Sequence, residues 1–552
     1  MNRWQHVSLV VSSALAHRRA VALMRCWGLV SLLSIASCAS GSNPGTIASN
    51  NEGRITVGTT QKPRTLDPAD AYELRSIALI RNLSDRLYTY DPGSTVLKPQ
   101  LATALPTVST DGLTYTIPIR QGVVFHDGTA FNAAAMAFSL QRFIQNKGKP
   151  SSLLSDRIAT ITATGTYELT ITLKKPFAAL ASVLAFPGTC AVSPTAYKIG
   201  KNLFEANTFV GTGPYELKEY GTDRVKLTAF DRYWGAKPLN RGVNVQIFNN
   251  NSANLYNSFR TGAVDVAFQA LEPDQVKSLE EGAKAGKWQS IAIDGSVTSY
   301  LILNVLQQPL DNPSVRQALA ALVDRPTINE RVLYGQGNPL YSILPSTFSV
   351  SQPGFKTTYG DGNISKAKQL LTQAGFSPQN PAKIQIWYPS GSTNRRLTAG
   401  FLRAYAKQKL GGILDIEPNT IESASFFKYA SKNIYPATLQ DWYPDFLDPD
   451  NFVQPFLECP KGSVKTGCQE GSSQSQGSFY YSDRMNQLIT AQGKEADPTK
   501  RKQIYADIQT LILQDVPLIP LWQTKDFVFA KKGMSGIAID PLQNLLYSTI
   551  KK

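Results

Sequence analysis

The chain has 552 residues, of which 42% are hydrophobic and 18% charged, and its formal net charge is +15. These proportions are typical of folded globular proteins and exclude a disordered chain. The length exceeds the size at which a single core stops growing, so we expect two or three packed lobes. The Lys and Arg residues are dispersed, without the consecutive runs that nucleic-acid binding favours, so no nucleic-acid partner is expected.

The first 37 residues have the pattern of a secretory signal peptide. Arginines precede the apolar run 27–35, and the small residues Ala36 and Ser37 follow it. A basic segment, a short apolar stretch and a small-residue cleavage site define such a signal. The run is too short to span a membrane comfortably. A second apolar stretch, 7–16, fits this pattern poorly, which leaves Met24 open as the true start.

The segment 35–38, Ile-Ala-Ser-Cys, is similar to a bacterial lipobox. It predicts cleavage before Cys38 and a lipid on its thiol; the alternative is an ordinary signal peptide with an incidental cysteine. Residues 38–52 are rich in small polar residues and predict a flexible tether. We therefore expect a lipid-anchored protein in the periplasm or on the outer face of the cytoplasmic membrane.

Strand and helix patterns alternate through the rest of the chain. Period-two alternation of apolar residues predicts strands at 115–120, 169–173, 225–229 and 243–247. Capping residues followed by helical apolar spacing predict helices that begin at Asn132, Asn312, Ser365 and Asp497. The mixture predicts an α/β or α+β class. The Ser- and Gln-rich tract 471–477 predicts an exposed loop.

The cysteines predict a disulfide bond and no zinc knuckle. Cys459 and Cys468 flank a polar loop that a disulfide can close in an oxidising compartment, the alternative being two free thiols. Cys190 is interpreted as a buried apolar residue. His126 is the one histidine beyond residue 37, and the Asp-Gly turn that follows predicts a hydrogen-bonded loop position for it. A site with two histidine ligands is therefore excluded within the mature chain.

Motifs of common enzymes are missing from the sequence. We find no GxSxG elbow, no P-loop and no HExxH. We therefore expect a binding protein without a cofactor. Carboxylate-only catalysis, as in glycosidases, stays open as an alternative.

The densest acidic segment is 441–452, with four carboxylates among aromatic residues and two prolines. The prolines predict a rigid loop rather than a helix. One interpretation is an Asp between aromatic walls that holds a ligand ammonium group. A second is Ca²⁺ binding by Asp445, Asp448 and Asp450, although the spacing is not that of an EF-hand. The third is that the acids cap helices and turns.

Many short segments follow one another in an order that is shared with a known family. They are 65–68, 87–91, 111–115, 119–128, 211–215, 233–235, 312–319, 367–376 and 442–452. Each is weak alone, but together, from about residue 54 to the C-terminus, they resemble the large extracytoplasmic solute-binding proteins of ABC importers. That family includes the oligopeptide, dipeptide, nickel and glutathione receptors.

The resemblance implies a large periplasmic-binding-protein fold of the α/β class, with two main lobes joined by a hinge and a smaller domain inserted in lobe I. The implied ranges are lobe I, 53–86, 192–297 and 523–552; lobe II, 87–191; and lobe III, 298–522. Crossings near 297 and 522 would form the hinge, which bends as the cleft closes around a solute. The implied partners are separate permease and ATPase subunits, with the chain itself a monomer.

The resemblance also implies a ligand site. In peptide-binding members, the Asp three residues after the Trp of this loop holds the peptide α-ammonium group, which corresponds here to Asp445. Trp442 would form a wall of the cleft, with Tyr443 beside it. Phe268 matches an aromatic position that lines the cleft, with core packing as the alternative. Tyr300 is a further lining candidate.

The leading prediction is a receptor for short peptides. Lys428 and Lys432, just before the acidic loop, are the candidate partners of a ligand carboxylate. Nickel-chelate, opine-like and oligosaccharide receptors of the same family are alternatives. A secreted carboxylate-dependent hydrolase and a lipoprotein that binds another protein are alternatives of other classes.

Overall fold

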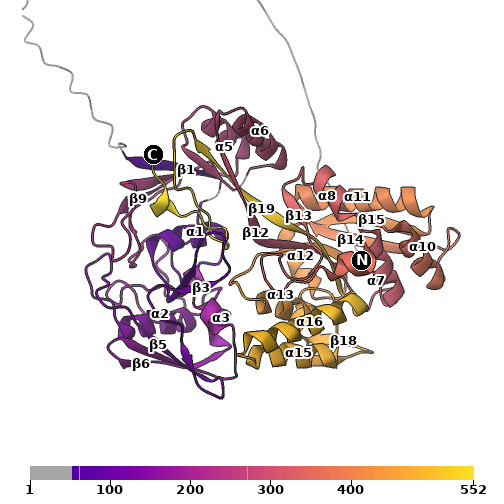
Figure 1. Ribbon diagram of the computed structural model, residues 1–552, viewed down its shortest axis with the longest axis horizontal. Coiled ribbons are helices and arrows are strands. Elements are labelled where there is room, and N and C mark those ends of the chain that lie inside the picture. The colour runs from indigo at the N-terminus through magenta and orange to yellow at the C-terminus, as the bar shows by residue number, and fades with distance from the viewer. Residues whose placement is uncertain (1–52, 61, 270) are drawn as a thin grey trace, which may run out of the picture. The chain divides into compact units, whose positions relative to one another are not determined.

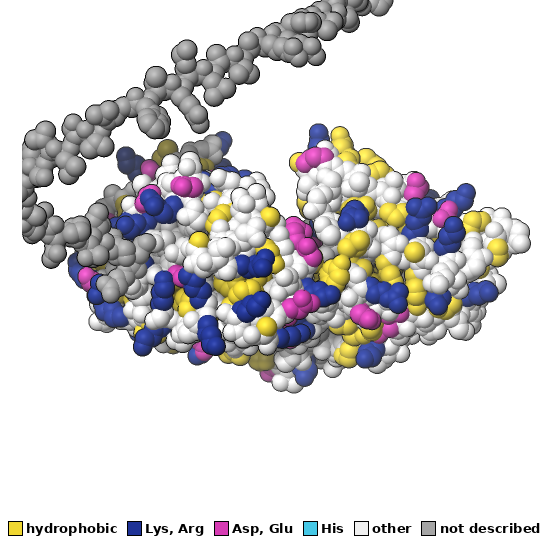
Figure 2. All heavy atoms as spheres, turned by 90° about the horizontal axis from the view of Figure 1, so that it is seen from above, with side chains coloured by type: hydrophobic (Ala, Val, Ile, Leu, Met, Phe, Trp, Pro, Cys, Tyr) yellow, Lys and Arg dark blue, Asp and Glu magenta, His cyan; other side chains and the backbone are white. Residues whose placement is uncertain are grey.

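The computed structural model describes residues 53–552 except 61 and 270. The predicted signal peptide, the tether and Cys38 lie outside the described residues. None of the helices in the described ranges combines the length and apolar character that a membrane crossing needs. Figure 2 shows Lys and Arg side chains scattered over one face of the molecule rather than gathered in a patch.

The main sheet has eleven strands in the order β15-β14-β16-β12-β19-β11-β1-β10-β9-β8, with β13 paired to β19. The strands are β1 (Arg54–Thr59), β8 (Tyr215–Tyr220), β9 (Arg224–Ala229), β10 (Gly242–Ile247), β11 (Val266–Phe268), β12 (Trp288–Leu303), β13 (Gly337–Pro339), β14 (Ala382–Pro389), β15 (Leu414–Ile421), β16 (Ala437–Trp442) and β19 (Leu518–Lys531). Parallel and antiparallel pairs are mixed, since β1 pairs with β10 in parallel and β12 with β19 antiparallel. The sheet confirms the predicted α/β class.

Strands β12 and β19 lie side by side in the middle of the sheet, as Figure 1 shows. Their first shared part lies beside β11, and their second part lies beside β16, which begins the other half of the sheet. The register between them shifts between Asp294 and Thr298. A register shift of this kind bends a strand pair locally. The predicted crossings near 297 and 522 fall at this shift, and the lobe boundaries themselves stay a prediction.

The segment after β1 contains a small separate sheet. Strands β4 (Thr107–Val108), β5 (Thr114–Pro118), β7 (Glu168–Leu173) and β6 (Ile158–Gly165) form it in that order, and β2 (Tyr88–Tyr90) pairs with β3 (Leu97–Pro99). Arg142, on α2 (Ala133–Gln145), makes a bidentate ion pair of 2.7 and 2.6 Å with the carboxylate of Asp67. Both side chains are buried, so this pair fixes α2 against the segment that precedes α1 (Leu74–Leu83).

Three of the four predicted helix starts are confirmed. The side chains of Asn132, Asn312 and Asp497 accept hydrogen bonds from the first-turn amides of α2, α7 (Pro313–Leu322) and α16 (Pro498–Asp515). The fourth helix, α10 (Ile364–Gln373), begins before Ser365 because Asn363 caps it by accepting from Lys366 N. The four predicted strands are confirmed as β5, β7, β9 and β10.

The remaining elements are α3 (Ser152–Ser155), α4 (Leu180–Val183), η1 (Pro187–Thr189), α5 (Ser252–Arg260), α6 (Pro273–Lys284), α8 (Arg325–Arg331), α9 (Gly354–Tyr359), α11 (Thr393–Leu410), α12 (Ser423–Ala430), α13 (Asp450–Leu457), β17 (Lys461–Ser463), β18 (Gly467–Glu470), α14 (Ser472–Ser475), α15 (Asp483–Lys494) and η2 (Tyr547–Thr549). Of these, α3 packs against β6 of the small sheet, and β17 and β18 form a separate hairpin.

Two loop predictions near the acidic segment are wrong in part. The loop 441–452 ends early because α13 begins at Asp450, directly after Pro449, and proline is compatible with the start of a helix. The tract 471–477 is not an exposed loop. It contains the short helix α14, and Ser473 is fully buried there, with its hydroxyl donating to Tyr480 O at 2.7 Å.

Candidate functional site

The loop between β16 and α13 lies where three cavities meet. Cavity A, of about 370 Å³, is lined by Asp441 and Tyr443 together with residues of β11, β19 and α11. Cavity B, of about 380 Å³, is lined by residues 441–445 on one side and by Tyr72 among others on the opposite side. Cavity C, of about 570 Å³, is lined by Trp442 and Asp445 together with residues of α3, α13 and α14. The three cavities therefore form one cleft around residues 441–445.

The walls of this cleft come from distant parts of the chain. Cavity B is also lined by Glu73, Leu74 and Ile77 at the start of α1, by Phe186 and Pro187 at the start of η1, and by Leu542 near the C-terminus. Strand pairing in the main sheet places β16, and thus the start of the loop, next to β12 and β19. The fold thus brings segments from both halves of the sheet to one site.

Asp445 lies on this cleft with a partly buried carboxylate. Its Oδ2 accepts a hydrogen bond of 3.0 Å from the Tyr72 hydroxyl, and its backbone amide donates to Asn451 Oδ1 at 3.0 Å. Burial raises the pKa of Asp445 to about 6, against the opposing effects of the Tyr72 hydrogen bond and the charge of Arg157. Because burial penalises the ionised form of this carboxylate, a cation that enters the cleft would stabilise that form.

Trp442 and Tyr443 lie on either side of the loop backbone. Trp442 lines cavities B and C, and its ring packs edge-on against Phe456 at 5.2 Å. Tyr443 lines cavities A and B, and 47% of its surface is exposed. Desolvation of its hydroxyl end and the nearby carboxylates of Asp441 and Asp526 raise the pKa of Tyr443 to about 12. Both aromatic side chains therefore line the cleft, and their contact with a solute stays a prediction.

Phe268 and Tyr300 have different positions. Phe268, at the end of β11, lines cavity A, and its contact with a ligand stays a prediction. Tyr300 lies in the core instead: it is fully buried, its hydroxyl bonds with Ile343 O and Thr298 Oγ1, and it lines none of the three cavities. The reason is strand alternation, because the preceding Ser299 donates to Asp441 on the cleft side and Tyr300 therefore faces the opposite way.

The cations near the cleft differ from those expected. Lys428 and Lys432 are exposed on and after α12 and line none of the three cavities. Arg157, after α3, lines cavity C together with Asp445. Arg395, on α11, pairs at 2.5 Å with Asp441. Neither arginine belongs to a motif in the sequence, so only the fold identifies them.

The calcium interpretation of the acidic loop is wrong. Asp448 is occupied by a bidentate ion pair of 2.7 Å with Arg501, and it caps the following turn by accepting from Asp450 N at 2.9 Å. Asp450 accepts a hydrogen bond from Gln492, and burial raises its pKa to about 6. Across the described ranges, no three His, Cys, Asp or Glu side chains are grouped so as to hold a metal ion.

The cysteines and the histidine are absent from the linings of the three cavities. The structure joins Cys459 and Cys468 in a disulfide bond beside the β17–β18 hairpin. Cys190 is a buried free thiol, as expected. His126 sits in a loop, where its ring nitrogens bond with Gly211 N and Gly213 O, and burial lowers its pKa. Their contacts are therefore with the surrounding fold.

Residues 96–463 match the family model of the bacterial extracellular solute-binding proteins, family 5 Middle. The glutathione-binding protein GsiB of Escherichia coli O1:K1 / APEC is 29% identical over 505 residues, which cover 88% of this chain and 92% of that protein. The dipeptide binding protein from Pseudoalteromonas sp. SM9913, solved in complex with Met-Leu, is 24% identical with a TM-score of 0.72, covering 90% of this chain and 99% of that one.

A second solved structure, NikA from Brucella suis in complex with Fe(III)-EDTA, is 21% identical with a TM-score of 0.78 and covers 90% of this chain and 100% of its own. At these identities the structures establish a shared fold. They confirm the predicted multi-domain α/β architecture.

Proposed function

Because the chain belongs to family 5 of the bacterial extracellular solute-binding proteins of ABC importers, we propose that it captures short peptides with a free N-terminus. The ligand lies in the cleft around residues 441–445 and is then delivered to a permease. The observation that carries this proposal is Asp445, a partly buried carboxylate that lines cavities B and C between aromatic side chains.

The carboxylate of Asp445 has room for a ligand ammonium group. Within the described residues, Tyr72 supplies the one side-chain hydrogen bond that it accepts, whereas an ionised carboxylate offers about four acceptor positions. An ammonium group brings three donors and the opposite charge, and charge-assisted hydrogen bonds are the strong ones. Arg157 lines the same cavity C, so a short zwitterionic peptide meets charges of both signs. The relatives named for glutathione and solved with Met-Leu support a peptide-like solute.

Calorimetry on four combinations tests this function. Trialanine and N-acetyl-trialanine are titrated into wild type and into Asp445→Asn, which keeps the shape and removes the charge. Losing one partner of a buried charge pair typically costs about 2–5 kcal/mol, or roughly thirty-fold to several thousand-fold in affinity. Each single change should weaken binding by this amount. Both together should cost much less than the sum, because they delete the same pair.

Asp156→Asn is the matched control, because Asp156 lines cavity C but is exposed. It should leave trialanine affinity within a few-fold of wild type. Equal binding of free and acetylated peptide by wild type would contradict the amine role of Asp445. The nickel-chelate, opine-like and oligosaccharide alternatives would then move ahead. Mass spectrometry of the peptide after incubation distinguishes a receptor from the hydrolase alternative, because a receptor leaves the peptide uncleaved.

We also propose that the cleft closes on its ligand by bending where β12 and β19 change register, between lobe I (53–86, 192–297 and 523–552, with lobe II, 87–191, inserted) and lobe III (298–522). The register shift at Asp294 and Thr298 supports this location, since it interrupts the ladder of both connecting strands at one level. Small-angle X-ray scattering should give a smaller radius of gyration at saturating ligand. An unchanged radius would argue against closure.

The proposed receptor works as a monomer anchored through lipid on Cys38, and separate permease and ATPase subunits act with it. The lipobox-like segment 35–38 supports the anchor. Cys38→Ala should move the protein from the membrane fraction to the soluble extracytoplasmic fraction. Retention of Cys38→Ala protein in the membrane would place the anchor elsewhere.

A further inference from the structure

Cavity A contains a second carboxylate that no part of the proposed ammonium site uses. Asp526, on β19, is 8% exposed and lines this cavity. Its Oδ1 accepts a hydrogen bond from Gln543, but its Oδ2 has no hydrogen-bond partner among the described residues. Buried carboxylate oxygens in folded proteins are normally paired, so an unpaired one needs an explanation.

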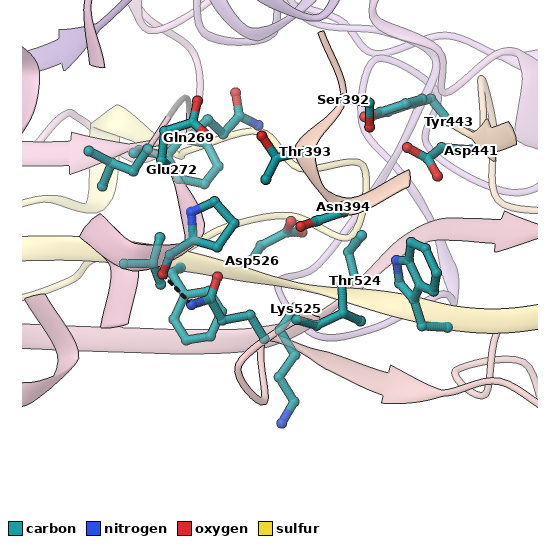
Figure 3. Close-up of a pocket in the computed structure, with 18 of the residues that line it drawn as sticks. Gln269, Glu272, Ser392, Thr393, Asn394, Asp441, Tyr443, Thr524, Lys525 and Asp526 are labelled. Atoms are coloured by element: carbon teal, nitrogen blue, oxygen red, sulfur yellow. Dashed lines mark hydrogen bonds between the residues drawn. The ribbon is translucent and has the colours of Figure 1, made fainter. Parts of the chain in front are cut away.

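Two further acceptor atoms of residues that line cavity A also have no hydrogen-bond partner among the described residues. Thr524 Oγ1 and Asn394 Oδ1 are buried and also lack a partner within the described ranges. Thr524 and Asp526 are two residues apart on β19 and so share a face of the strand, whereas Asn394 comes from the first turn of α11. Figure 3 shows Asn394 and Asp526 directed into the same pocket from these two elements.

Asp526 and Thr524 approach the backbone of a glycine closely. A Cβ at Gly295 would lie 2.7 Å from Asp526 Oδ2 and 2.8 Å from Thr524 Oγ1. Both oxygens therefore face the same backbone position, and a side chain at 295 would displace them. Gly295 belongs to β12, next to the register shift.

The charges around cavity A favour a cation. Glu272 lines it as a second acid, and Asp441 is already paired with Arg395. Lys525 lines it too, but Figure 3 shows its ammonium group pointing away from the pocket. Burial, with a contribution from the nearby Asp540, raises the pKa of Asp526 to about 7 despite the Gln543 hydrogen bond. An unpaired buried carboxylate is stabilised most by a donor that carries positive charge.

We propose that cavity A is a second cation subsite, in which Asp526 pairs with an ammonium or guanidinium group on the side chain of a bound peptide and Thr524 and Asn394 accept its remaining hydrogen bonds. The inference rests on the proposed function, because Asp445 holds the peptide's α-ammonium group. Cavities A and B share Asp441 and Tyr443, so a peptide anchored at Asp445 can pass Tyr443 into cavity A. The preferred ligands are therefore short basic peptides.

Matched peptides test the subsite on the wild-type chain. Ala-Lys-Ala and Ala-Ala-Lys are compared by calorimetry with their norleucine counterparts, which keep the side-chain length and lose the charge. At least one lysyl peptide should bind ten-fold or more tightly than its norleucine counterpart. Acetylation of the lysine Nε should remove that advantage. Equal affinities of lysyl and norleucyl peptides at both positions would overturn the proposal.

Substitutions in cavity A test whether Asp526 causes the preference for lysyl peptides. Asp526→Asn should reduce the lysine preference to about three-fold or less while leaving norleucyl peptide affinity within about three-fold. Asp294→Asn is the matched control: Asp294 is an exposed carboxylate on the neighbouring strand β12, outside cavity A, and its loss should leave the preference intact. Thr524→Val keeps the shape of the side chain and removes its hydroxyl. It is a second test if Asp526→Asn fails to fold, and it should lower the lysine preference several-fold.

The outcomes separate this inference from the proposed function. If acetylation of the peptide N-terminus has no effect, the ammonium site at Asp445 fails and the proposed function fails with it. If N-terminal acetylation weakens binding but lysine and norleucine peptides bind equally, only the second subsite fails. A lysine preference that survives Asp526→Asn places the cation elsewhere in the cleft and also overturns the inference.

Discussion

The hydroxyl of Tyr72 donates a hydrogen bond of 3.0 Å to Oδ2 of Asp445, and 373 positions of sequence separate the two residues. Tyr72 lies just before α1, whereas Asp445 follows β16, so this bond crosses cavity B. Among the described residues, no side chain donates a hydrogen bond to Oδ1 of Asp445. The first prediction concerns the protonation state of Asp445, and the second concerns the effect of the Tyr72 hydrogen bond on it.

Peptide affinity should fall as the pH drops below about 6. The ammonium group pairs with ionised Asp445, whose pKa burial raises to about 6, and ammonium binding lowers that pKa, so binding below pH 6 releases a proton. The apparent Kd should therefore rise about five-fold between pH 6 and 5, and it should rise again above about pH 8, where the peptide's own α-amino group loses its proton. Calorimetry with trialanine checks this, since it has no basic side chain. In Asp445→Asn the rise below pH 6 should vanish; its persistence would assign that titration to another group.

Tyr72→Phe should move this pH midpoint upward. The Tyr72 hydrogen bond favours the ionised form of Asp445 and lowers its pKa against the effect of burial, so its removal raises the pKa further. We expect an upward shift of up to about one pH unit, with affinity near that of wild type at pH 8.5. Tyr167→Phe, an exposed tyrosine outside the cleft, is the control and should not shift the midpoint. A downward shift for Tyr72→Phe would contradict the assigned role.

Arg142→Met should strongly destabilise the fold. It leaves the carboxylate of Asp67, which is 0% exposed, without its bidentate partner, and breaking a buried ion pair in this way costs about 3–5 kcal/mol. Urea unfolding at pH 7 measures the loss as a lower midpoint. Arg484→Met is the control, because its pair with Asp507 is exposed and 3.8 Å long, and it should cost less than about 1 kcal/mol. Equal midpoints for the two variants would show that the Asp67 pair adds no stability.

Cys459 and Cys468 should resist alkylation in the exported protein until a reductant is added. The bond closes a short loop between two cysteines that are nine positions apart in the sequence, and in the chain-entropy description a disulfide around such a loop stabilises the fold by about 2–3 kcal/mol. Peptide mapping with and without reductant measures the pairing. Cys190 provides an internal control, because it is a buried free thiol that should become alkylated only on unfolding. Alkylation of both Cys459 and Cys468 without reductant would contradict the prediction.

Features that depend on a few neighbouring residues could be predicted from the sequence. The starts of α2, α7 and α16 follow from Asn132, Asn312 and Asp497, because a cap bonds an amide only two or three residues away. The early start of α10 was missed because Asn363 competes with Ser365 over the same turn. The acidic loop could be located because its aromatic residues, prolines and carboxylates are contiguous.

Residue orientation within a strand needed the structure. Tyr300 and Ser299 are adjacent, and the sequence does not say which of the two faces the cleft. Pairing of β12 with β16 decides it, since it sets Ser299 against Asp441 and turns Tyr300 into the core. One residue of register exchanges the two faces of a strand.

By itself, the sequence determined the α/β class, the family resemblance and the loop that carries Asp445, since these rest on local spacing and on the order of short segments. Only the tertiary structure decided which groups meet that loop. Tyr72, Arg157 and Asp526 come from three distant segments, and the packing of these segments around the loop brings them to one cleft. The physical reason is that burial and strand pairing act between residues hundreds of positions apart, whereas capping and alternation act within one turn or one strand.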